Sequence, residues 1–311
     1  MSKPVSVILD WGTSSLRAAL VSGAGETLDT RDTMNGGIQF VQNGVFEAAL
    51  SDTVGEWFSA YGPLPVFASG MITSRNGWVE VPYVDAPAGV VELAAGTRQF
   101  TLVNGATVTF LPGMRDPAAK PFPDVMRGEE TQIVGCGLDR DRTVVLPGTH
   151  SKWARVKDGR ICGFQTFATG EIFALLTKHS FIARAVETAP GTEPIWPAFD
   201  RGGEFAASDA SAADALLSAI FSARTGVLAG ILKPEDIGDY VSGLIIGSEF
   251  RQARAAGWLV PGEAIAIVGN NILNSRYSRI APLFNVAVEP SPVDAAKRGV
   301  QFIANQLQLI T

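Results

Sequence analysis

Two short turns in the sequence combine glycine with hydroxyl side chains, a composition that suits phosphate binding. The first turn reads Asp-Trp-Gly-Thr-Ser-Ser at residues 10–15, and the second reads Pro-Gly-Thr-His-Ser-Lys at residues 147–152. A turn that contains glycine exposes backbone N–H groups to phosphate oxygens, and Thr and Ser add hydroxyl donors. Asp10 ends a predicted strand, where a carboxylate can hold a water-coordinated Mg²⁺. Each turn alone is compatible with an ordinary hairpin, but the pair predicts a site that holds a triphosphate.

A third segment, Val-Gly-Asn-Asn-Ile-Leu at residues 268–273, follows a predicted strand and opens a predicted helix. Small residues there allow a flat base to approach the backbone, and the helix N-terminus adds hydrogen-bond donors. The alternative is a plain strand-to-helix turn in which Asn270 or Asn271 caps the helix. The two histidines, His150 and His179, lack the Ser/His/Asp spacing that would indicate a hydrolase triad.

The elements that must position these turns recur in two parts of the chain. In the first part, strands are predicted over residues 5–10, 16–22 and 26–33, then a helix over 46–60 and a strand over 65–69. In the second part, strands are predicted over 143–147, 152–157 and 160–168, then a helix over 170–180. Each part opens with a strand, a Gly-Thr turn and a second strand. The chain is therefore expected to consist of two related domains, residues 1–139 and 140–311.

Further elements extend both halves. Asn104-Gly105 predicts a tight hairpin, and a helix is predicted from Gly128 to Gly137 with two glutamates in its first turn, where the helix dipole favours acids. The second half continues with an irregular segment over 188–203, helices over 211–224, 234–256, 271–281 and 292–307, and strands over 263–268 and 284–288. This order is typical of an α/β fold in which helices cover both faces of a mixed sheet.

Composition narrows the classes of partner and the compartment. The 311 residues carry a net charge of −6, so no positive field is expected that would neutralise nucleic acid or an anionic membrane surface. Only two cysteines occur, Cys136 and Cys162, without the spacing of a disulfide framework or a zinc site. No export or anchoring signal is visible in the sequence, and the cytoplasm is the expected location.

Six segments carry a resemblance to a known family. They are, in chain order, DWGTSSLR (10–17), ASGMITSRNGWVEVPY (68–83), VMRGEETQIVG (125–135), LPGTHSKW (146–153), TGEIFALLTKHS (169–180) and SGLIIGSE (242–249). This set closely resembles the 2-dehydro-3-deoxygalactonokinase family over nearly the whole chain. The resemblance implies duplicated ribonuclease H-like domains of the sugar kinase, Hsp70 and actin superfamily (the actin-like ATPase fold), with mixed sheets flanked by helices and an ATP cleft between the domains. It also implies transfer of the γ-phosphoryl group of ATP to the terminal hydroxyl of 2-dehydro-3-deoxy-D-galactonate, giving the 6-phosphate in galactonate breakdown.

The resemblance assigns roles to residues in these segments. The β- and γ-phosphates would be held by Asp10 through Mg²⁺ and by Gly12, Thr13, Ser14, Gly148, Thr149 and Lys152. Adenosine would lie against Gly269 and Asn270. The sugar acid would contact Ser69, Arg75, Trp78, Tyr83 and Arg127, with an arginine on its carboxylate. Pro147 stands where many relatives carry an acid, so metal binding is not expected from that side.

The general base is expected at the start of the helix that follows Gly128, because related sugar kinases carry a carboxylate there. Glu129 is favoured over Glu130, and Asp124 is the reserve candidate. Either glutamate could instead be a helix N-terminal charge or pair with Arg127.

Alternatives exist for the substrate and for the function. A kinase of the same fold could act on another aldonic or keto sugar, such as 2-dehydro-3-deoxygluconate. A nucleotide-binding regulator of the actin type would keep the phosphate turns without a sugar pocket, and residues 68–83 argue against it. Arg75 could nevertheless be a solvated loop charge, and Trp78 could pack in the core. A homo-oligomer is left open.

Overall fold

A computed structural model describes residues 2–185, 193–208, 216–260 and 262–308, and the chain divides into two compact units. Unit 1 comprises Met1–Asp141, Val156–Phe164 and Pro292–Thr311, and unit 2 comprises Arg142–Arg155 and Gln165–Ser291. The domain boundary expected from the sequence, between residues 139 and 140, lies near the point where the chain first passes from unit 1 to unit 2, after Asp141. The expected division differs from the two units farther along the chain, because residues 156–164 and the C-terminal segment belong to unit 1.

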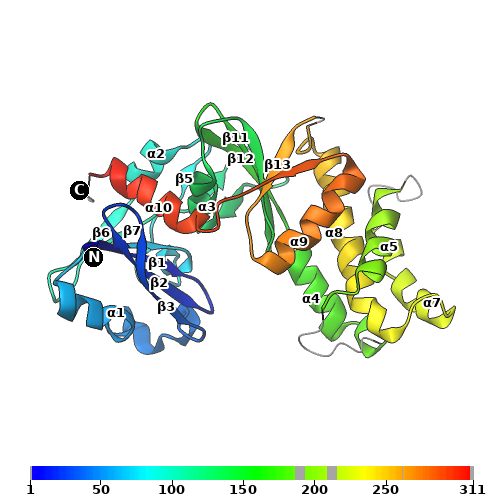
Figure 1. Ribbon diagram of the computed structural model, residues 1–311, viewed down its shortest axis with the longest axis horizontal. Coiled ribbons are helices and arrows are strands. Elements are labelled where there is room, and N and C mark those ends of the chain that lie inside the picture. The colour runs from blue at the N-terminus through cyan, green and yellow to red at the C-terminus, as the bar shows by residue number, and fades with distance from the viewer. Residues whose placement is uncertain (1, 186–192, 209–215, 261, 309–311) are drawn as a thin grey trace. The chain divides into compact units, whose positions relative to one another are not determined.

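Unit 1 is built on a six-stranded mixed sheet with the strand order β3-β2-β1-β4-β7-β6 (Figure 1). Its strands are β1 (Pro4–Trp11), β2 (Leu16–Ser22), β3 (Thr27–Thr33), β4 (Val66–Ser69), β6 (Arg98–Thr101) and β7 (Thr107–Phe110). β1 is antiparallel to β2 and parallel to β4, and β4 is parallel to β7. Parallel neighbours bring the carboxyl ends of β1 and β4 to one edge, the edge at which α/β sheets bind ligands.

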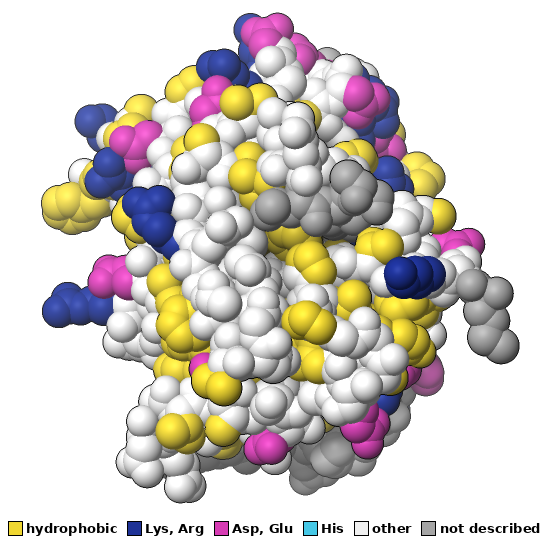
Figure 2. All heavy atoms as spheres, turned by 90° about the vertical axis from the view of Figure 1, so that its left-hand side faces the viewer, with side chains coloured by type: hydrophobic (Ala, Val, Ile, Leu, Met, Phe, Trp, Pro, Cys, Tyr) yellow, Lys and Arg dark blue, Asp and Glu magenta, His cyan; other side chains and the backbone are white. Residues whose placement is uncertain are grey.

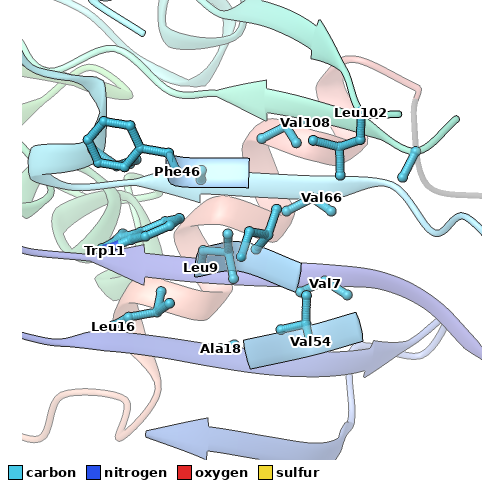
Figure 3. Packing of buried hydrophobic residues seen from close by; sticks show 14 of the residues in the cluster. Val7, Leu9, Trp11, Leu16, Ala18, Phe46, Val54, Val66, Leu102 and Val108 are labelled. Atoms are coloured by element: carbon cyan, nitrogen blue, oxygen red, sulfur yellow. The ribbon is translucent and has the colours of Figure 1, made fainter. Parts of the chain in front are cut away.

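The core of unit 1 follows from two sequence periods. Alternate residues of β1, namely Val7, Leu9 and Trp11, face the same cluster, because successive side chains of a strand point to opposite faces. Helix α1 (Phe46–Tyr61) covers that face with Phe46, Leu50, Val54 and Trp57, which recur at the three- and four-residue spacing of one helix face. Figure 3 shows part of this layer, with Phe46 and Val54 of the helix beside the β1 side chains. The sheet therefore holds the end of β1 rigidly.

The remaining elements of unit 1 include a second, smaller sheet and the helix that starts at the predicted catalytic acids. They are the 3-10 helices η1 (Ile38–Phe40), η2 (Gln42–Gly44) and η3 (Met71–Thr73), the three-stranded sheet of β5 (Val84–Asp85), β8 (Met114–Asp116) and β9 (Asp124–Met126), and the helices α2 (Val90–Ala95), α3 (Glu129–Cys136) and α10 (Ala295–Gln306). A Cβ on Gly135 of α3 would overlap the carbonyl oxygen of Ala295, and one on Gly299 would overlap that of Thr131. Glycine thus allows α3 and α10 to pack at backbone distance, which holds α3 in place.

Unit 2 repeats the sheet arrangement of unit 1. The five-stranded sheet has the order β12-β11-β10-β13-β14, made from β10 (Arg142–Leu146), β11 (Ser151–Lys157), β12 (Arg160–Phe167), β13 (Ala264–Ile267) and β14 (Ala287–Glu289). Its residues belong to unit 2 except for the end of β11 and the first part of β12, which fall within Val156–Phe164 of unit 1. The order β12-β11-β10-β13 matches β3-β2-β1-β4, and β10 is parallel to β13 as β1 is to β4. This match is the duplication that the sequence predicted.

Helices make up the rest of unit 2. They are α4 (Thr169–His179), η4 (Ile182–Ala185), α5 (Trp196–Ala207), α6 (Leu216–Ala219), α7 (Ser222–Leu228), η5 (Pro234–Asp236), α8 (Ile237–Ala255), α9 (Asn271–Ile280) and η6 (Ala281–Phe284). The long helix α8 is mostly buried and packs against α5, where a Cβ on Gly202 or Gly243 would overlap the backbone of the other helix. Two clusters of buried hydrophobic residues in unit 2 draw on α8, so it is the central helix of unit 2.

Most predicted elements form within a few residues of their expected limits, and three expectations differ. The irregular segment expected over 188–203 ends in helix α5 from Trp196, and residues 188–192 lie outside the described residues. The helix expected over 211–224 is divided into α6 and α7, with residues 211–215 also outside the described residues. The strand expected over 284–288 begins later, at Ala287. Glycine and proline near Trp196 masked a helix that tertiary packing on α8 stabilises.

On the face shown in Figure 2, charged side chains of both signs are scattered and no patch of one sign forms. Among the described residues, no helix has both the length and the apolar character needed to cross a membrane.

Candidate active site

The site candidates lie on two turns, one in each unit. The unit-1 turn is residues 10–15, at the end of β1, and the unit-2 turn is residues 147–151, which lead from β10 into the first residue of β11. Both turns leave the sheet at the carboxyl end of a strand with a parallel neighbour. Each turn is described below with the residues of its own unit.

Asp10 stands near the carboxyl end of β1, opposite Ser69 of β4 and opposite Arg17 of β2. Its side chain is 41% exposed, and its Oδ2 lies 3.7 Å from Nη1 of Arg17. Loss of surrounding water raises the pKa of Asp10, the positive charge of Arg17 lowers it, and the charge of Asp32 raises it further. A cation beside this carboxylate would favour its ionised form. The chemistry of Asp10 therefore fits a Mg²⁺ ion that arrives with phosphate groups.

The rest of the unit-1 turn presents hydroxyl groups to solvent, since Thr13 and Ser14 are exposed. The segment after β3 supports the unit-1 turn through backbone hydrogen bonds. Backbone N–H groups of Ile38 and Gln39 donate to the carbonyl oxygens of Gly12 and Thr13 at 3.0 and 3.2 Å. The sequence did not predict these hydrogen bonds, because they join residues more than twenty positions apart.

Two glycines bring the start of α3 next to Asp10. Gly70 follows β4 with a φ of 91°, and Gly128 precedes α3 with a φ of 107°, a backbone region that residues with a Cβ rarely adopt. A Cβ on Gly128 would lie 3.4 Å from the Cα of Gly70, and a Cβ on Gly70 would lie 3.3 Å from Oδ1 of Asp10. The unit-1 turn, the end of β4 and the first turn of α3 therefore converge.

The two glutamates that begin α3 differ in exposure. Glu129 is partly exposed, and its Oε2 accepts a hydrogen bond from the backbone N–H of Arg127 at 3.0 Å. Glu130 is only 1% exposed, and its Oε2 accepts from the backbone N–H of Gly128 at 2.8 Å. Both carboxylates thus lie in the first turn of α3 and accept hydrogen bonds from backbone N–H groups just before it. Glu129 is the one of the two that reaches the surface.

Burial is the main cause that raises the pKa of Glu130, from 4.5 to about 8, and the adjacent charge of Glu129 adds to it. Hydrogen bonds from the backbone N–H groups of Glu130 and Gly128 and the charge of Arg127 act in the opposite direction. In most molecules the Glu130 carboxyl group is therefore protonated at neutral pH, and a protonated carboxyl group is a poor acceptor for a substrate proton.

Arg127 is used largely to hold the loop between η3 and β5. Its Nη1 donates to the carbonyl and hydroxyl oxygens of Thr73 at 2.8 and 2.6 Å, and its Nη2 donates to the carbonyl oxygen of Val81 at 2.9 Å. The guanidinium lies 4.3 Å from the centre of the Tyr83 ring, which is 39% exposed. Within the part of the chain that the structure describes, its buried Nε lacks a hydrogen-bond partner. The hydrogen bonds that Arg127 makes are therefore to the loop itself.

The other predicted sugar contacts differ in what their side chains already do. Ser69 is 2% exposed, and its hydroxyl donates to the carbonyl oxygen of Leu9 at 3.2 Å. The Trp78 ring stacks on Phe46 at 6.1 Å and joins an aromatic cluster of the core. Trp78 therefore packs the core, as the alternative proposed. Arg75 is exposed in the same loop.

The unit-2 turn rests on the first turn of α4. The backbone N–H of Glu171 donates to the carbonyl oxygen of Thr149 at 3.0 Å, and Nε2 of His150 lies 2.8 Å from Oε2 of Glu171. A Cβ on Gly170 would overlap the backbone of Gly148 and Thr149, so the helix approaches the turn at backbone distance. Thr149 is exposed. Hydroxyl and backbone donors of the turn thus lie beside the positive end of a helix dipole.

The segment predicted for adenosine lies next to the unit-2 turn, because β10 and β13 are parallel neighbours. A Cβ on Gly269 would lie 3.5 Å from the carbonyl oxygen of Pro147. Gly269 and Asn270 are both exposed. The Oδ1 of Asn270 accepts from the backbone N–H of Leu273 at 2.9 Å, so Asn270 also caps α9. The structure brings these two predicted segments together.

Two further candidates, Lys152 and Asp124, lie on strands rather than on turns. Lys152 of β11 is 6% exposed, and its Nζ donates to Oγ1 of Thr166 at 2.7 Å. Asp124 of β9 is partly exposed, and its Oδ1 accepts from the backbone N–H of Val125 at 2.7 Å. Both side chains already take part in local hydrogen bonds, unlike the exposed hydroxyls of the two turns.

A buried carboxylate that sequence reasoning did not assign is bonded to residues around the unit-2 turn. Glu249 of α8 is 2% exposed. Its Oε1 accepts from Oγ of Ser151 at 2.6 Å and from Nε1 of Trp153 at 2.7 Å, and its Oε2 accepts from the hydroxyl of Tyr277 at 2.7 Å. The side chain of Thr169 also hydrogen-bonds to it. The only sequence signal was an acid at the end of an apolar stretch.

Comparison with known proteins identifies the family of this chain. A model of the 2-keto-3-deoxy-galactonokinase family matches residues 10–303. The chain belongs to this family. The 2-dehydro-3-deoxygalactonokinase of Escherichia coli (strain K12) is 31% identical over 302 residues, which are 96% of this chain and 97% of that protein. The resemblance drawn from the six sequence segments is thereby confirmed.

Solved structures agree with the family and the fold. A crystal structure from Sinorhizobium meliloti, described as a candidate 2-dehydro-3-deoxygalactonokinase, has a TM-score of 0.83 and 31% identity, covering 97% of this chain and 99% of that one. The activator of the 2-hydroxyisocaproyl-CoA dehydratase from Clostridium difficile, solved with bound ADPNP, has a TM-score of 0.52 and 11% identity over 97% and 96% of the two chains. At that identity the likeness concerns the fold alone, and the predicted fold class is confirmed.

Glu130 of this galactonokinase-family chain should make its stability depend on pH. A pKa that is higher in the folded state means that folding favours the protonated acid, so the stabilisation is complete below pH 4.5 and is lost as the pH rises through about 8. Glu130→Gln mimics the neutral acid and should remove this loss. Relative to the variant, the wild type should lose up to about 5 kcal/mol of unfolding free energy, at about 1.4 kcal/mol per pKa unit.

Urea unfolding of both proteins between pH 5 and pH 9 measures this difference. Glu56→Gln, at a side chain that is 89% exposed, controls for the chemical change itself. Parallel stability curves for the wild type and Glu130→Gln across this range would contradict the assignment of a protonated, buried Glu130.

Proposed function

We propose that this sugar acid kinase transfers the γ-phosphoryl group of ATP to the terminal hydroxyl of 2-dehydro-3-deoxy-D-galactonate, giving the 6-phosphate in galactonate catabolism. The family match over residues 10–303 supports this activity. The observation that carries the proposal is the convergence of the unit-1 turn, Gly70 and the first turn of α3. It sets a carboxylate beside a turn with exposed phosphate-binding groups, the pair that phosphoryl transfer to a hydroxyl needs.

We assign the exposed groups of both turns to the phosphates. Hydroxyls of Thr13, Ser14 and Thr149 and backbone N–H groups of the turns would donate to phosphate oxygens. Mg²⁺ is commonly held by one or two carboxylates together with substrate phosphates, and Asp10 is suited to be such a carboxylate. When bound, this ion would neutralise charge on the transferring group. Gly269 and Asn270 would contact adenosine.

We assign the sugar acid to the loop between η3 and β5. Arg75 is exposed and can turn toward a carboxylate, and Arg127 holds the loop in which Arg75 lies. The partly exposed Tyr83, held against Arg127, would form a wall of the pocket. Ser69 can accept a hydrogen bond while its own proton is held by Leu9. These donors match a substrate with one carboxylate and several hydroxyls.

We assign the general base to Glu129. Its carboxylate begins α3 within the converging segments, and it is partly exposed, whereas Glu130 is buried and largely protonated at neutral pH. During transfer the Glu129 carboxylate would accept the proton of the sugar hydroxyl as the oxygen attacks phosphorus. The hydrogen bond from the Arg127 backbone would orient the carboxylate for this step.

The cysteines support a reducing compartment, which we take to be the cytoplasm. Cys136 is buried and Cys162 is exposed, and neither forms a disulfide. Free thiols persist where glutathione and thioredoxin keep them reduced.

A direct test of the substrate is a coupled assay of ADP release with a panel of keto-deoxy acids. We expect turnover with 2-dehydro-3-deoxygalactonate and at least about 10-fold lower kcat/KM with its gluconate epimer, because a misplaced hydroxyl leaves buried donors unpaired. The converse preference would assign the epimer as substrate. Nucleotide hydrolysis without phosphorylation of any sugar acid would favour a nucleotide-binding regulator.

Replacing Arg75, the residue proposed to bind the carboxylate of the sugar acid, should change the KM for the sugar acid only. Arg75→Met should raise KM for the sugar acid by about 10-fold or more, since a charged hydrogen bond is lost, with KM for ATP unchanged. Arg98→Met, at an exposed arginine on β6, is the matched control and should change neither KM. An equal rise in both KM values for Arg75→Met would assign that side chain a structural role instead.

Replacing the proposed base, Glu129, should lower the rate of phosphoryl transfer without weakening substrate binding. Glu129→Gln should lower kcat by about 10²- to 10⁴-fold, because an amide keeps the hydrogen bond to Arg127 but cannot accept a proton. Binding of MgADP and of the sugar acid should remain within about 2-fold, as is expected for a group that acts in the transition state. Glu130→Gln should have a mild effect at pH 7. A severe loss at Glu130 with a mild one at Glu129 would reverse the assignment.

A further inference from the structure

One buried, hydrogen-bonded ionisable group of unit 2 has no role in the proposed kinase function. Glu249 stands in the middle of the buried helix α8 and is 2% exposed. Its two oxygens accept hydrogen bonds from Ser151, Trp153, Tyr277 and Thr169. Burying a carboxylate is costly unless donors surround it, so these four donors and the acid must be kept together.

The four donors belong to three segments that surround the proposed nucleotide site. Ser151 ends the unit-2 turn, and Trp153 continues it into β11. Thr169 begins α4, whose next residue lies against the backbone of the turn. Tyr277 lies on α9, the helix that begins directly after the segment assigned to adenosine. Glu249 therefore joins the turn, the α4 N-terminus and α9 through a single carboxylate.

We infer that Glu249 is a positioning residue for nucleotide binding, an inference that rests on the proposed kinase function. It touches neither phosphate nor adenosine, because it is enclosed within the protein. Its four hydrogen bonds hold in register the segments that carry Thr149, Gly269 and Asn270. A misplacement of such segments by a fraction of an ångström weakens ligand contacts even when the fold persists.

A carboxylate suits this position better than an amide of the same size. Burial raises the pKa of Glu249, and the four side-chain donors around it act against that rise because they hydrogen-bond to the ionised form. An ionised carboxylate only accepts hydrogen bonds and has about four lone-pair sites, which equals the number of these donors. In Glu249→Gln, one oxygen is replaced by an NH₂ group that faces hydroxyl or indole donors. The donors on that side lose their acceptor, and the segments they belong to are no longer held together.

The decisive experiment measures nucleotide and sugar binding separately by titration calorimetry. For Glu249→Gln we expect the Kd of MgADP to rise by about 10-fold or more, the loss expected for hydrogen bonds to a charged group. The Kd of the sugar acid should stay within about 2-fold, because its proposed contacts lie in unit 1. Ser248→Ala is the matched control: Ser248 is also buried on α8, its hydroxyl donates only to Leu244 of the same helix, and its Kd values should match the wild type.

A milder variant keeps the test decisive if Glu249→Gln does not fold. Tyr277→Phe removes one of the four hydrogen bonds while keeping the ring, and should raise the Kd of MgADP about 3-fold or more. Folded variants that bind MgADP as the wild type does would overturn the inference, as would equal losses for nucleotide and sugar acid, which indicate a general structural role. A wild type that does not bind MgADP would instead refute the proposed function.

Discussion

Parallel pairing of the strand that precedes each proposed phosphate turn is the constraint on which the candidate site residues of each unit depend. β1 runs parallel to β4, so Asp10 and Ser69 end their strands side by side. β10 runs parallel to β13, so the unit-2 turn and the segment at Gly269 leave the sheet at the same edge. A parallel neighbour requires a crossover connection between the paired strands. That connection carries helix α1 in unit 1, and in unit 2 it spans α4 to α8.

Close backbone approach is the second requirement of the site. Gly70 and Gly128 bring the start of α3 against Asp10, and Gly170 brings α4 against the unit-2 turn. Farther from the proposed site, Gly135 and Gly299 allow α3 and α10 to pack tightly, so the C-terminal helix supports the helix that begins with Glu129, the proposed base. Side chains at these positions would separate elements whose backbones supply donors and caps.

The two buried glutamates, Glu130 and Glu249, differ in the groups that offset the free-energy cost of burying an acid. Glu130 has backbone donors but a like-charged neighbour, and burial raises its pKa to about 8, so it is largely neutral near pH 7. Burial raises the pKa of Glu249 as well, and the hydrogen bonds from four side-chain donors act against that rise. Glu130 thus affects the stability of unit 1, whereas the hydrogen bonds of Glu249 organise the segments of unit 2 that surround the turn.

The sequence alone determined the class of the fold, its duplication and the family, because these depend on local patterns. Apolar runs that end at Asp10 and Pro147, followed by glycine and hydroxyl residues, predict strands and turns from neighbouring residues. Helix α5 was missed for the opposite reason. Its glycines disfavour a helix locally, and only packing against α8 stabilises it.

Tertiary structure decided what individual site residues do. The sequence placed Trp78 and Arg127 in a substrate segment, but the fold packs one ring into the core and uses most of the other side chain to hold the loop. It also distinguished Glu129 from Glu130, which are adjacent in sequence and differ only in which face of α3 is buried. Glu249 could not be recognised from the sequence, because its four partners come from positions 28 to 98 residues away. Burial and long-range hydrogen bonding, which no local pattern records, set these roles.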